Sequence, residues 1–549
     1  MSEATATPPP NQTHPAESSL RETLESIIIA FVLAFVFRAF VVEAFVIPTG
    51  SMAPTLLGQH MRIQCPDCGY RYVVGPRHYA DPPVRRLPVQ DQRNLALICP
   101  MCQYPIEHAS LRLRSGDRIL VLKYVYAFRE PKRWEVVVFK NPERPQENYI
   151  KRLVGLPNEQ LWILQGDLFT RPLLPSGRYG EWGVERKPDR VQRAVWQPVY
   201  HSDYRPLEEA APGESVRLRP WKMPWTGVGP SAEAWTTDPL GPDIRFQDGG
   251  GRPGILRFDF NNHNSLNFYF YNETERMDHR AGNNSFHDFR FGATIKPDDS
   301  GLGLWMLGGT DDQWFRGSID AKGLVRLQMQ PKQPLLFRPD DNEWLEAPAG
   351  AILGSAPLSA GRGTRVELWH VDQSLSFWAD GRCLARWTYG DELDAESIEQ
   401  LAKRRPTINP PTIEIGLEGS AVALRAVNLD RDLYYTQPPG YNYHPVGRPI
   451  GTKPLGTAGR PATIGSSQYF CLGDNSPASK DSRLWERVDP WANHMVKKIT
   501  GADVPEGLVP RQLMLGKAFF VYFPAPYPVA NKQATVGVIP NFGRMRFIR

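Results

Sequence analysis

Apolar residues follow two patterns along the chain: one continuous run near the start, then many short runs further on. Eleven apolar residues stand together from Ile27 to Phe37 (IIIAFVLAFVF), and the apolar character continues past Arg38. A bilayer-spanning helix needs about 20 residues. The pattern therefore predicts a transmembrane anchor over 21–46, with a helix from about Leu20 to Phe40 in which Arg38 reaches toward the membrane surface.

The residues before this run are polar and rich in proline, so a disordered tail is expected over 1–20. A cleaved signal peptide is the alternative interpretation of the apolar run. The long, proline-rich and non-basic leading segment is not typical of such a peptide. A single-pass membrane anchor is therefore the preferred prediction.

Beyond the anchor the pattern is typical of β-strands. Four short apolar runs occupy 117–126, 134–140, 148–157 and 161–169. Proline accounts for 52 of 549 residues, which disfavours long helices. The chain is therefore predicted to be mainly β.

Period-two alternation becomes persistent in a later part of the chain. It is clearest in RVELWHV, in TIEIGL and in QSLSFWADGRCLARW, where Asp380-Gly381 supplies a hairpin turn. Strands spaced in this way predict a two-sheet β-sandwich (jelly roll) at about 240–436, inside a large insertion over 172–465.

The net charge argues against nucleic-acid binding. The formal charge is only +5, and no basic motif interleaved with aromatic residues is present, so we expect no nucleic-acid partner.

Four of the six cysteines form two C-x2-C pairs, a spacing typical of a zinc ribbon over 62–110. The metal ligands would be Cys65, Cys68, Cys99 and Cys102. Redox-active pairs or disulfides remain alternatives.

A serine directly after the apolar segment is a candidate nucleophile. Ser51 lies in IPTGSMAPTL, and a serine hydroxyl needs a neighbouring base to become reactive. No histidine occupies a motif-like setting and no metal-ligand cluster includes the serine. Lys151, in the strand-like run YIKRLVGL, is the candidate base. Its pKa would have to fall by about three units from ~10.4, which burial can cause.

Four motifs in a fixed order strengthen this pairing. IPTGSMAPTL, SGDRILVLKY, YIKRLVGLP and GDNSPASKDSR, after a membrane-like segment, resemble the motifs of bacterial type I signal peptidases. RAFVVEAFVIP, RWEVVVFKNP and VPRQLMLGKAFFVYFP extend the similarity, which covers less than half of the chain. The resemblance implies a β catalytic core divided into 47–61, 111–171 and 466–549.

The resemblance also implies residue roles. Ser51 matches the nucleophile and Lys151 the general base, while Thr49 matches a hydroxyl donor to the oxyanion. Ser479 matches the serine that orients the lysine, and Asp481 and Arg483 match a supporting ion pair.

Two positions depart from the family pattern. Asn158-Glu159 and Trp134-Glu135 stand where the family has Gly-Asp. Both pairs lie in turns beside strands, so the departures put local loop geometry in doubt rather than the chemistry.

The implied function is a membrane-bound serine endopeptidase that removes signal peptides from preproteins after Ala-x-Ala, without a catalytic cofactor. Its place would be the inner membrane, with the catalytic domain on the periplasmic face. The expected partners are signal peptides, the lipid bilayer and the translocation machinery. Two rivals are a self-cleaving Ser/Lys protease and a glycan-binding scaffold on a peptidase-like frame.

The predicted sandwich resembles concanavalin-like jelly rolls, many of which bind glycans through exposed aromatic residues. Four tryptophans could serve this role, and the alternative is that they are core residues. They are Trp305, Trp314, Trp369 and Trp378.

Overall fold

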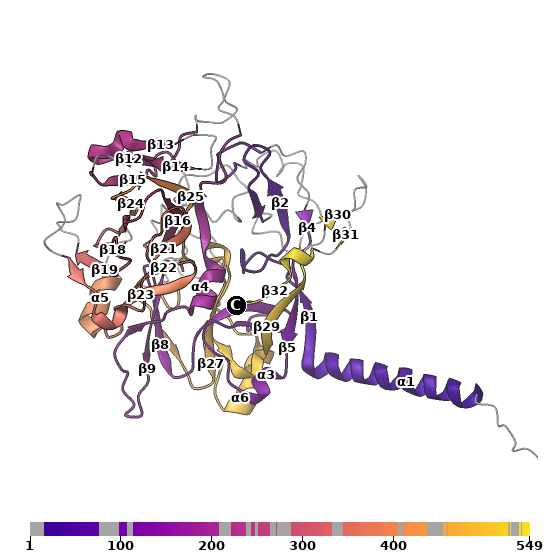
Figure 1. The fold of residues 1–549 in the computed structure, drawn as a ribbon. Coiled ribbons are helices and arrows are strands. Elements are labelled where there is room, and N and C mark those ends of the chain that lie inside the picture. The colour runs from indigo at the N-terminus through magenta and orange to yellow at the C-terminus, as the bar shows by residue number, and fades with distance from the viewer. Residues whose placement is uncertain are drawn as a thin grey trace, which may run out of the picture.

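The computed structural model confirms a mainly β protein (Figure 1). It describes residues 16–75, 98–106, 113–207, 221–237, 243–247, 251–263, 271, 287–331, 344–403, 410–435, 454–457, 459–524, 527–528, 537–539 and 541–549. Most of the predicted disordered tail lies outside these residues.

The first layer is an antiparallel core sheet built from both ends of the chain. Its order is β1-β5-β29-β6-β7-β27-β28, and β32 pairs with β29. The strands are β1 (Val42–Val46), β5 (Arg118–Leu122), β6 (Val136–Lys140), β7 (Asn148–Gly155), β27 (Gln468–Leu472), β28 (Val509–Pro510), β29 (Met514–Phe523) and β32 (Arg546–Phe547). Since β5, β6 and β7 share a sheet with β27 and β29, the segments 111–171 and 466–549 fold together although the large insertion separates them.

A second, four-stranded sheet adjoins the core sheet in the order β10-β9-β8-β26. Its strands are β8 (Glu159–Leu164), β9 (Asp167–Pro172), β10 (Gly183–Val184) and β26 (Ala462–Ile464). Two of these strands, β10 and β26, lie within 172–465, so that range is too wide for the insertion. Their pairing with β8 and β9 adds them to the second sheet.

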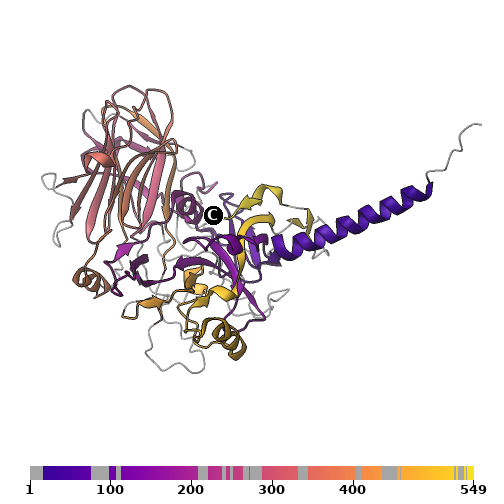
Figure 2. The same ribbon diagram turned by 90° about the horizontal axis from the view of Figure 1, so that it is seen from below.

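Two further sheets, of eight and seven strands, pack face to face as a β-sandwich, which Figure 2 shows as a separate lobe. One has the order β13-β14-β25-β16-β21-β22-β23 with β11 beside β25, and the other β12-β15-β24-β17-β18-β19-β20. The bounds are β11 (Gln197–His201), β12 (Trp225–Val228), β13 (Trp235–Thr237), β14 (Ile244–Phe246), β15 (Gly254–Phe258), β16 (Phe289–Pro297), β17 (Gly303–Gly309), β18 (Gln313–Ile319), β19 (Val325–Pro331), β20 (Leu345–Glu346), β21 (Thr364–Val371), β22 (Ser374–Ala379), β23 (Arg382–Thr388), β24 (Thr412–Glu418) and β25 (Val422–Arg431). The sandwich therefore begins near 197, earlier than the predicted 240.

Most of the sandwich tryptophans are core residues. Trp314, Trp369 and Trp378 are at most 4% exposed, and only Trp305 is partly accessible. Trp369 stacks on Trp378 at 4.5 Å between ring centroids, and Trp196, which follows helix α4 (Asp189–Val195), meets Trp369 edge-on. These aromatic residues join the sandwich to α4 instead of facing solvent, so the glycan-binding prediction loses its main support.

The remaining elements are short. The cysteine segment forms a three-stranded ribbon sheet, β3-β2-β4, with β2 (His60–Gln64), β3 (Arg71–Val74) and β4 (Leu113–Arg114). The other elements are α3 (Val125–Phe128), α5 (Ala395–Lys403), α6 (Pro490–Thr500), β30 (Tyr527–Pro528), β31 (Gly537–Ile539) and the 3-10 helices η3 (Gly229–Ala234), η5 (Ala349–Ala351), η6 (Ser476–Ala478), η7 (Arg511–Leu513) and η8 (Phe542–Arg544).

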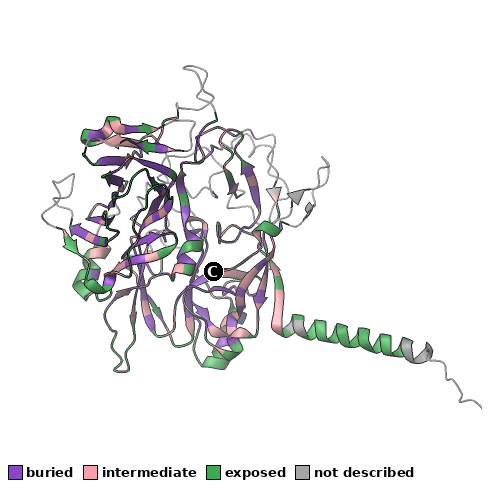
Figure 3. Cartoon of the chain, viewed as in Figure 1, coloured by how far each residue is buried: buried purple, intermediate pink, exposed green. Residues whose placement is uncertain are grey.

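The N-terminal segment differs from its prediction. Helix α1 (Ala16–Val36) begins inside the predicted tail and projects from the body with an exposed surface (Figure 3). A π-helical turn, η1 (Phe37–Val41), follows, and β1 pairs with β5. The last residues of the predicted anchor are therefore a strand of the core sheet. No helix among the described residues is both long and apolar enough to cross a membrane.

Candidate active site

The loop that carries Ser51 leaves the end of β1 and is fastened to the start of β5 by Asp117. Ile47 N–H donates to Asp117 O at 2.9 Å, Asp117 N–H to Leu57 O at 2.8 Å, and Leu57 N–H to the Asp117 carboxylate at 3.0 Å. Asp117 is fully buried. Both ends of the nucleophile loop are thus held by one residue of the SGD motif.

The structure brings Lys151 to Ser51. Lys151 Nζ donates a hydrogen bond to Ser51 Oγ at 2.7 Å and a second to Ile150 O at 3.1 Å. These side chains are 100 positions apart in sequence, and strand β7 in the core sheet places the lysine under the serine loop.

Burial changes the acidity of this lysine. Lys151 is 3% exposed. Its desolvation lowers the pKa from 10.5 to about 8, although the nearby carboxylates of Asp481 and Asp474 act in the opposite direction. Desolvation disfavours the charged form of an amine. A substantial fraction of Lys151 is therefore neutral near pH 8 and able to accept a proton.

A second loop, between β27 and η6, packs against the serine. Asn475 N–H donates to Ser51 O at 3.1 Å, and Asn475 Nδ2 donates to Gly50 O at 2.9 Å. Gly473 lies so close that an added Cβ would overlap both Ser479 Oγ and Ser51 O. Only glycine fits there, because the two loops touch through backbone atoms.

A buried ion pair holds this second loop in shape, as the resemblance implies. Arg483 Nη2 lies 2.7 Å from the Asp481 carboxylate, and neither side chain is exposed. Arg483 also donates to Ser476 Oγ and to Ser476 O at 2.9 Å each, while Asp481 accepts from Gly473 N–H at 3.0 Å. The pair closes the loop onto itself and does not touch Ser51.

Two of the predicted supporting residues, Ser479 and Thr49, make no side-chain hydrogen bond with Ser51 or Lys151 among the described residues. Ser479 is buried, but its hydroxyl has no hydrogen-bond partner within the described part of the chain, so it makes no hydrogen bond to Lys151. Besides Ser51, Lys151 donates to Ile150 O. Thr49 is exposed on the nucleophile loop, two positions before Ser51, and its role stays a prediction.

Sequence reasoning missed a buried ion pair in the same region. Arg152 donates two hydrogen bonds to Asp474, at 2.8 and 2.6 Å, and both side chains are fully buried. Arg152 follows the lysine in β7, and Asp474 precedes Asn475, so the pair ties the strand of the base to the loop that holds the nucleophile. Both residues lie in motifs that the sequence had already marked.

The two departures from the family pattern keep the turns that glycine would make. Trp134 has a φ of 71° and Asn158 a φ of 62°, both in the left-handed region that favours glycine. The acidic residue after each is paired: Glu135 with Arg129 at 2.6 Å, and Glu159 with Arg133 at 2.7 Å. The altered residues therefore preserve the loop geometry.

The four predicted metal-ligating cysteines come together in the ribbon. Their sulfur atoms all lie within 4.8 Å of one another, with Cys65 Sγ and Cys102 Sγ 3.6 Å apart, and likewise Cys68 Sγ and Cys99 Sγ. Zn–S bonds of about 2.3 Å in a tetrahedron separate the sulfurs by about 3.8 Å. No disulfide joins any of the four, so the disulfide alternative is not seen.

The two C-x2-C turns share the same backbone hydrogen bond and a positive φ at the same position. Cys65 N–H donates to Tyr70 O at 2.9 Å and Cys99 N–H to Tyr104 O at 2.8 Å. The residue after each pair has a positive φ: 75° for Gly69 and 62° for Gln103. Two equivalent turns that face each other present four sulfurs around one point, which fits a closed site for a tetrahedral ion.

Comparison with known proteins agrees with this geometry. The family described as "Signal peptidase, peptidase S26" matches residues 20–72, 95–171 and 415–523, blocks that contain Ser51, Lys151 and the loop of Ser479. The unmatched stretch 172–414 holds most of the sandwich.

Individual relatives are distant. The chain is 23% identical over 188 residues to "Signal peptidase I" of Rickettsia bellii (strain OSU 85-389), covering 34% of this chain and 48% of that protein. It is 32% identical over 127 residues to "Signal peptidase I" of Pseudomonas fluorescens, covering 23% of this chain and 29% of that protein. The chain thus spans about half the length of the first of these relatives, and less of the second.

Among solved structures, the carbohydrate-binding module CBM66 from Bacillus subtilis is similar over 38% of this chain and 95% of its own, at 12% identity. Its TM-score of 0.22 is too low to establish a shared fold. The family assignment therefore depends on the sequence blocks. Over those blocks, and in relatives that carry the name of a signal peptidase, the chain is similar to the signal peptidase family, peptidase S26.

Proposed function

We propose that this protein is a membrane-associated serine endopeptidase that cleaves signal peptides from preproteins, with Ser51 as nucleophile and Lys151 as general base. One observation carries the proposal: a buried lysine contacts the hydroxyl of a serine on a loop at 2.7 Å, with a pKa lowered to about 8. A nucleophile within hydrogen-bond reach of a base with a suitable pKa is the arrangement that this chemistry requires.

The reaction follows from the contact. Ser51 Oγ attacks the scissile carbonyl carbon while its proton passes to neutral Lys151 Nζ. The tetrahedral intermediate collapses as the Lys151 ammonium gives that proton to the leaving amine, and an acyl-serine remains. Water then attacks the ester carbonyl with Lys151 again accepting a proton, which returns to Ser51 Oγ when the acid product leaves.

The oxyanion of each intermediate needs donors beside Ser51. We assign this role to the Ser51 N–H and the Thr49 hydroxyl, both on the nucleophile loop. Such a donor contributes about 3 kcal/mol to the stability of the transition state. The buried Asp117 and the Asn475 contacts hold that loop before substrate arrives, so its donors need not reorganise during the reaction.

Strand β1 suggests how the substrate lies. It occupies one end of the core sheet, pairs only with β5 among the described strands, and leads into Ser51. An extended peptide could add to this edge by backbone hydrogen bonds. The preference for small residues before the cut remains part of the proposal on the resemblance alone.

The exposed apolar surface of α1 supports a membrane location. Phe31, Leu33 and Phe35 are each at least 61% exposed. Contiguous apolar side chains exposed to this extent are unfavourable in water. We propose that α1 lies against or within lipid, next to the apolar segment of the signal peptide. The periplasmic orientation is part of this proposal, and contact with the translocation machinery stays a prediction.

We also propose that the four cysteines hold a structural Zn²⁺. A closed site of four thiolates leaves no coordination position for substrate, so the ion would stabilise the ribbon and take no part in the reaction.

The test is cleavage of a preprotein in detergent by the wild type, Ser51→Ala and Lys151→Ala. We expect cleavage after Ala-x-Ala by the wild type and none by the two variants. Lys480→Ala is the matched control, because this half-exposed lysine lies on the neighbouring loop and pairs with Glu143. Full activity in Lys151→Ala would mean that another base acts, and an inert wild type would reject the function.

A further inference from the structure

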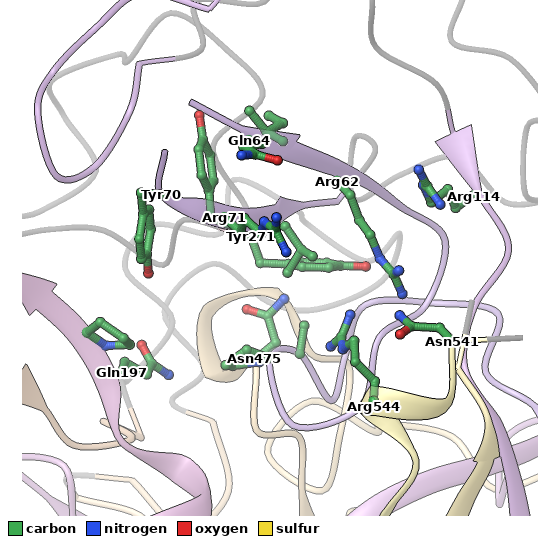
Figure 4. A pocket seen from close by; sticks show the side chains of 17 residues that line it. Arg62, Gln64, Tyr70, Arg71, Arg114, Gln197, Tyr271, Asn475, Asn541 and Arg544 are labelled. Atoms are coloured by element: carbon green, nitrogen blue, oxygen red, sulfur yellow. The ribbon is translucent and has the colours of Figure 1, made fainter. Parts of the chain in front are cut away.

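A pocket of about 880 Å³ lies beside the nucleophile loop and is covered by the ribbon sheet (Figure 4). Its lining includes Ala53 and Pro54, which follow Ser51, together with Asn475, which hydrogen-bonds to the serine backbone. Strands β2, β3 and β4 and the start of β11 contribute its walls. The volume is within the range of about 300–1,000 Å³ typical of ligand sites.

All charged side chains among the described lining residues are positive. Four arginines face the pocket from three parts of the chain, namely Arg62, Arg71, Arg114 and Arg544, and none of the described lining residues is acidic. Figure 4 shows the side chains of Arg62 and Arg544 pointing toward the same region, with Asn541 beside them. Such a lining favours an anionic ligand.

Unpaired donors point to the same ligand chemistry. Tyr72 Oη, Gln197 Nε2 and Asn541 Nδ2 belong to buried lining residues and have no hydrogen-bond partner among the residues that the structure places. A buried donor without a partner costs about 1–3 kcal/mol. An ionised carboxylate only accepts hydrogen bonds, so it suits a pocket lined by guanidinium groups and free N–H or O–H donors.

Two titratable groups near the pocket, Asp117 and His60, add no negative charge to its described lining. Asp117 is fully buried, does not line the pocket, and accepts from Leu57 N–H. His60, which accepts from Arg62 at 3.2 Å, has its pKa lowered to about 4 by burial and is neutral at pH 7. Neither group therefore places a negative charge among the described lining residues at pH 7.

Residues that adjoin Ser51 line the pocket, so part of a substrate bound at the serine can reach it. Strand β1, which follows α1 and the turn η1, precedes the serine in the chain, whereas the first lining residue of the pocket lies two positions after it. An apolar signal segment beside α1 would approach Ser51 along β1. The chain beyond the cut would then continue toward the pocket, within a few residues at about 3.3–3.6 Å per residue.

We propose that this pocket binds acidic side chains in the first few residues after the scissile bond, so that the enzyme prefers preproteins with an acidic start to the mature chain. This inference rests on the proposed function and deepens it. The ribbon supplies most of the arginines, which gives the cysteine segment a role in substrate selection.

The test compares two peptides with one cleavage site, carrying either Asp and Glu or Asn and Gln at the second to fifth positions after the cut. We expect kcat/KM of the wild type to favour the acidic peptide by about tenfold, a factor that falls at high salt. In Arg71→Gln/Arg544→Gln the ratio should approach one, and in Arg71→Glu/Arg544→Glu it should fall below one. Arg326→Gln, an exposed arginine on the sandwich strand β19, should keep the ratio of the wild type.

The outcomes separate the two proposals. Equal cleavage of both peptides by the wild type would overturn the pocket assignment and leave the peptidase function intact. A preference that survives in the paired arginine variants would also overturn it. Loss of binding to phosphatidylglycerol vesicles in those variants, with the peptide ratio unchanged, would assign the pocket to lipid instead. Failure to cleave either peptide would reject the peptidase function and this inference with it.

Discussion

The titration of Lys151 leads to a quantitative prediction for the pH dependence of cleavage. The perturbation is a rise from about pH 7 to about pH 9, across the pKa of about 8 that desolvation gives this lysine. Only the neutral amine can accept the Ser51 proton. The rate should therefore follow the neutral fraction of Lys151.

The magnitude follows from the pKa. With a pKa of about 8, the neutral fraction is about 9% at pH 7 and about 91% at pH 9, a roughly tenfold rise that is close to its plateau. A solvent-exposed lysine near 10.4 would be neutral in about 0.04% of molecules at pH 7. Its neutral fraction would rise about 100-fold to pH 9 without levelling off.

The assay is kcat/KM on an internally quenched peptide in detergent, measured in steps of half a pH unit with the fold monitored by circular dichroism. A rise of about tenfold that levels off above pH 8.5 agrees with the buried lysine as base. A profile that still climbs tenfold per unit at pH 9, or that is flat from pH 6, would refute the reasoning. The peptide should contain no group that titrates in this range.

Three further predictions concern stability and packing. Lys151→Met should abolish cleavage. It should also raise the free energy of unfolding by about 3 kcal/mol at neutral pH, because the native state no longer holds a lysine with a depressed pKa. This gain should shrink between about pH 8 and 10.5, which denaturant titrations at several pH values would show. A zinc chelator should lower the Tm of the wild type and release about one zinc per chain, as a colorimetric assay would show. Cys99→Ser should likewise lower Tm and lose this zinc, whereas Cys383→Ser should change neither. Gly473→Ala should reduce kcat/KM by about 100-fold because its Cβ would displace the nucleophile backbone, while Gly350→Ala, with open space around it, should leave kcat/KM unchanged.

The cysteines show how far spacing alone can go. Two C-x2-C pairs predict a common site because each pair forms its own tight turn from local residues, and the structure places all four sulfurs together. The predicted membrane anchor shows where the pattern of residues along the chain is not enough to predict the structure. Apolar residues continue across Arg38, and a short apolar run does not distinguish the end of a helix from a strand. Pairing of β1 with β5, far along the chain, decides that Val42–Val46 is a strand.

By itself, the sequence determined which residues can perform the chemistry and in what order they occur: a serine after an apolar segment, a lysine in a later strand, two thiol pairs, and alternating strands of a sandwich. Each of these is a matter of residue type and local spacing. The tertiary structure decided what depends on neighbours distant in sequence. It set the 2.7 Å contact and the lowered pKa of Lys151, because burial arises from the whole core sheet. It also left Ser479 without a hydrogen bond to Lys151, buried three sandwich tryptophans, and gathered four arginines around one pocket, since side chains from separate segments meet only when the sheets pack.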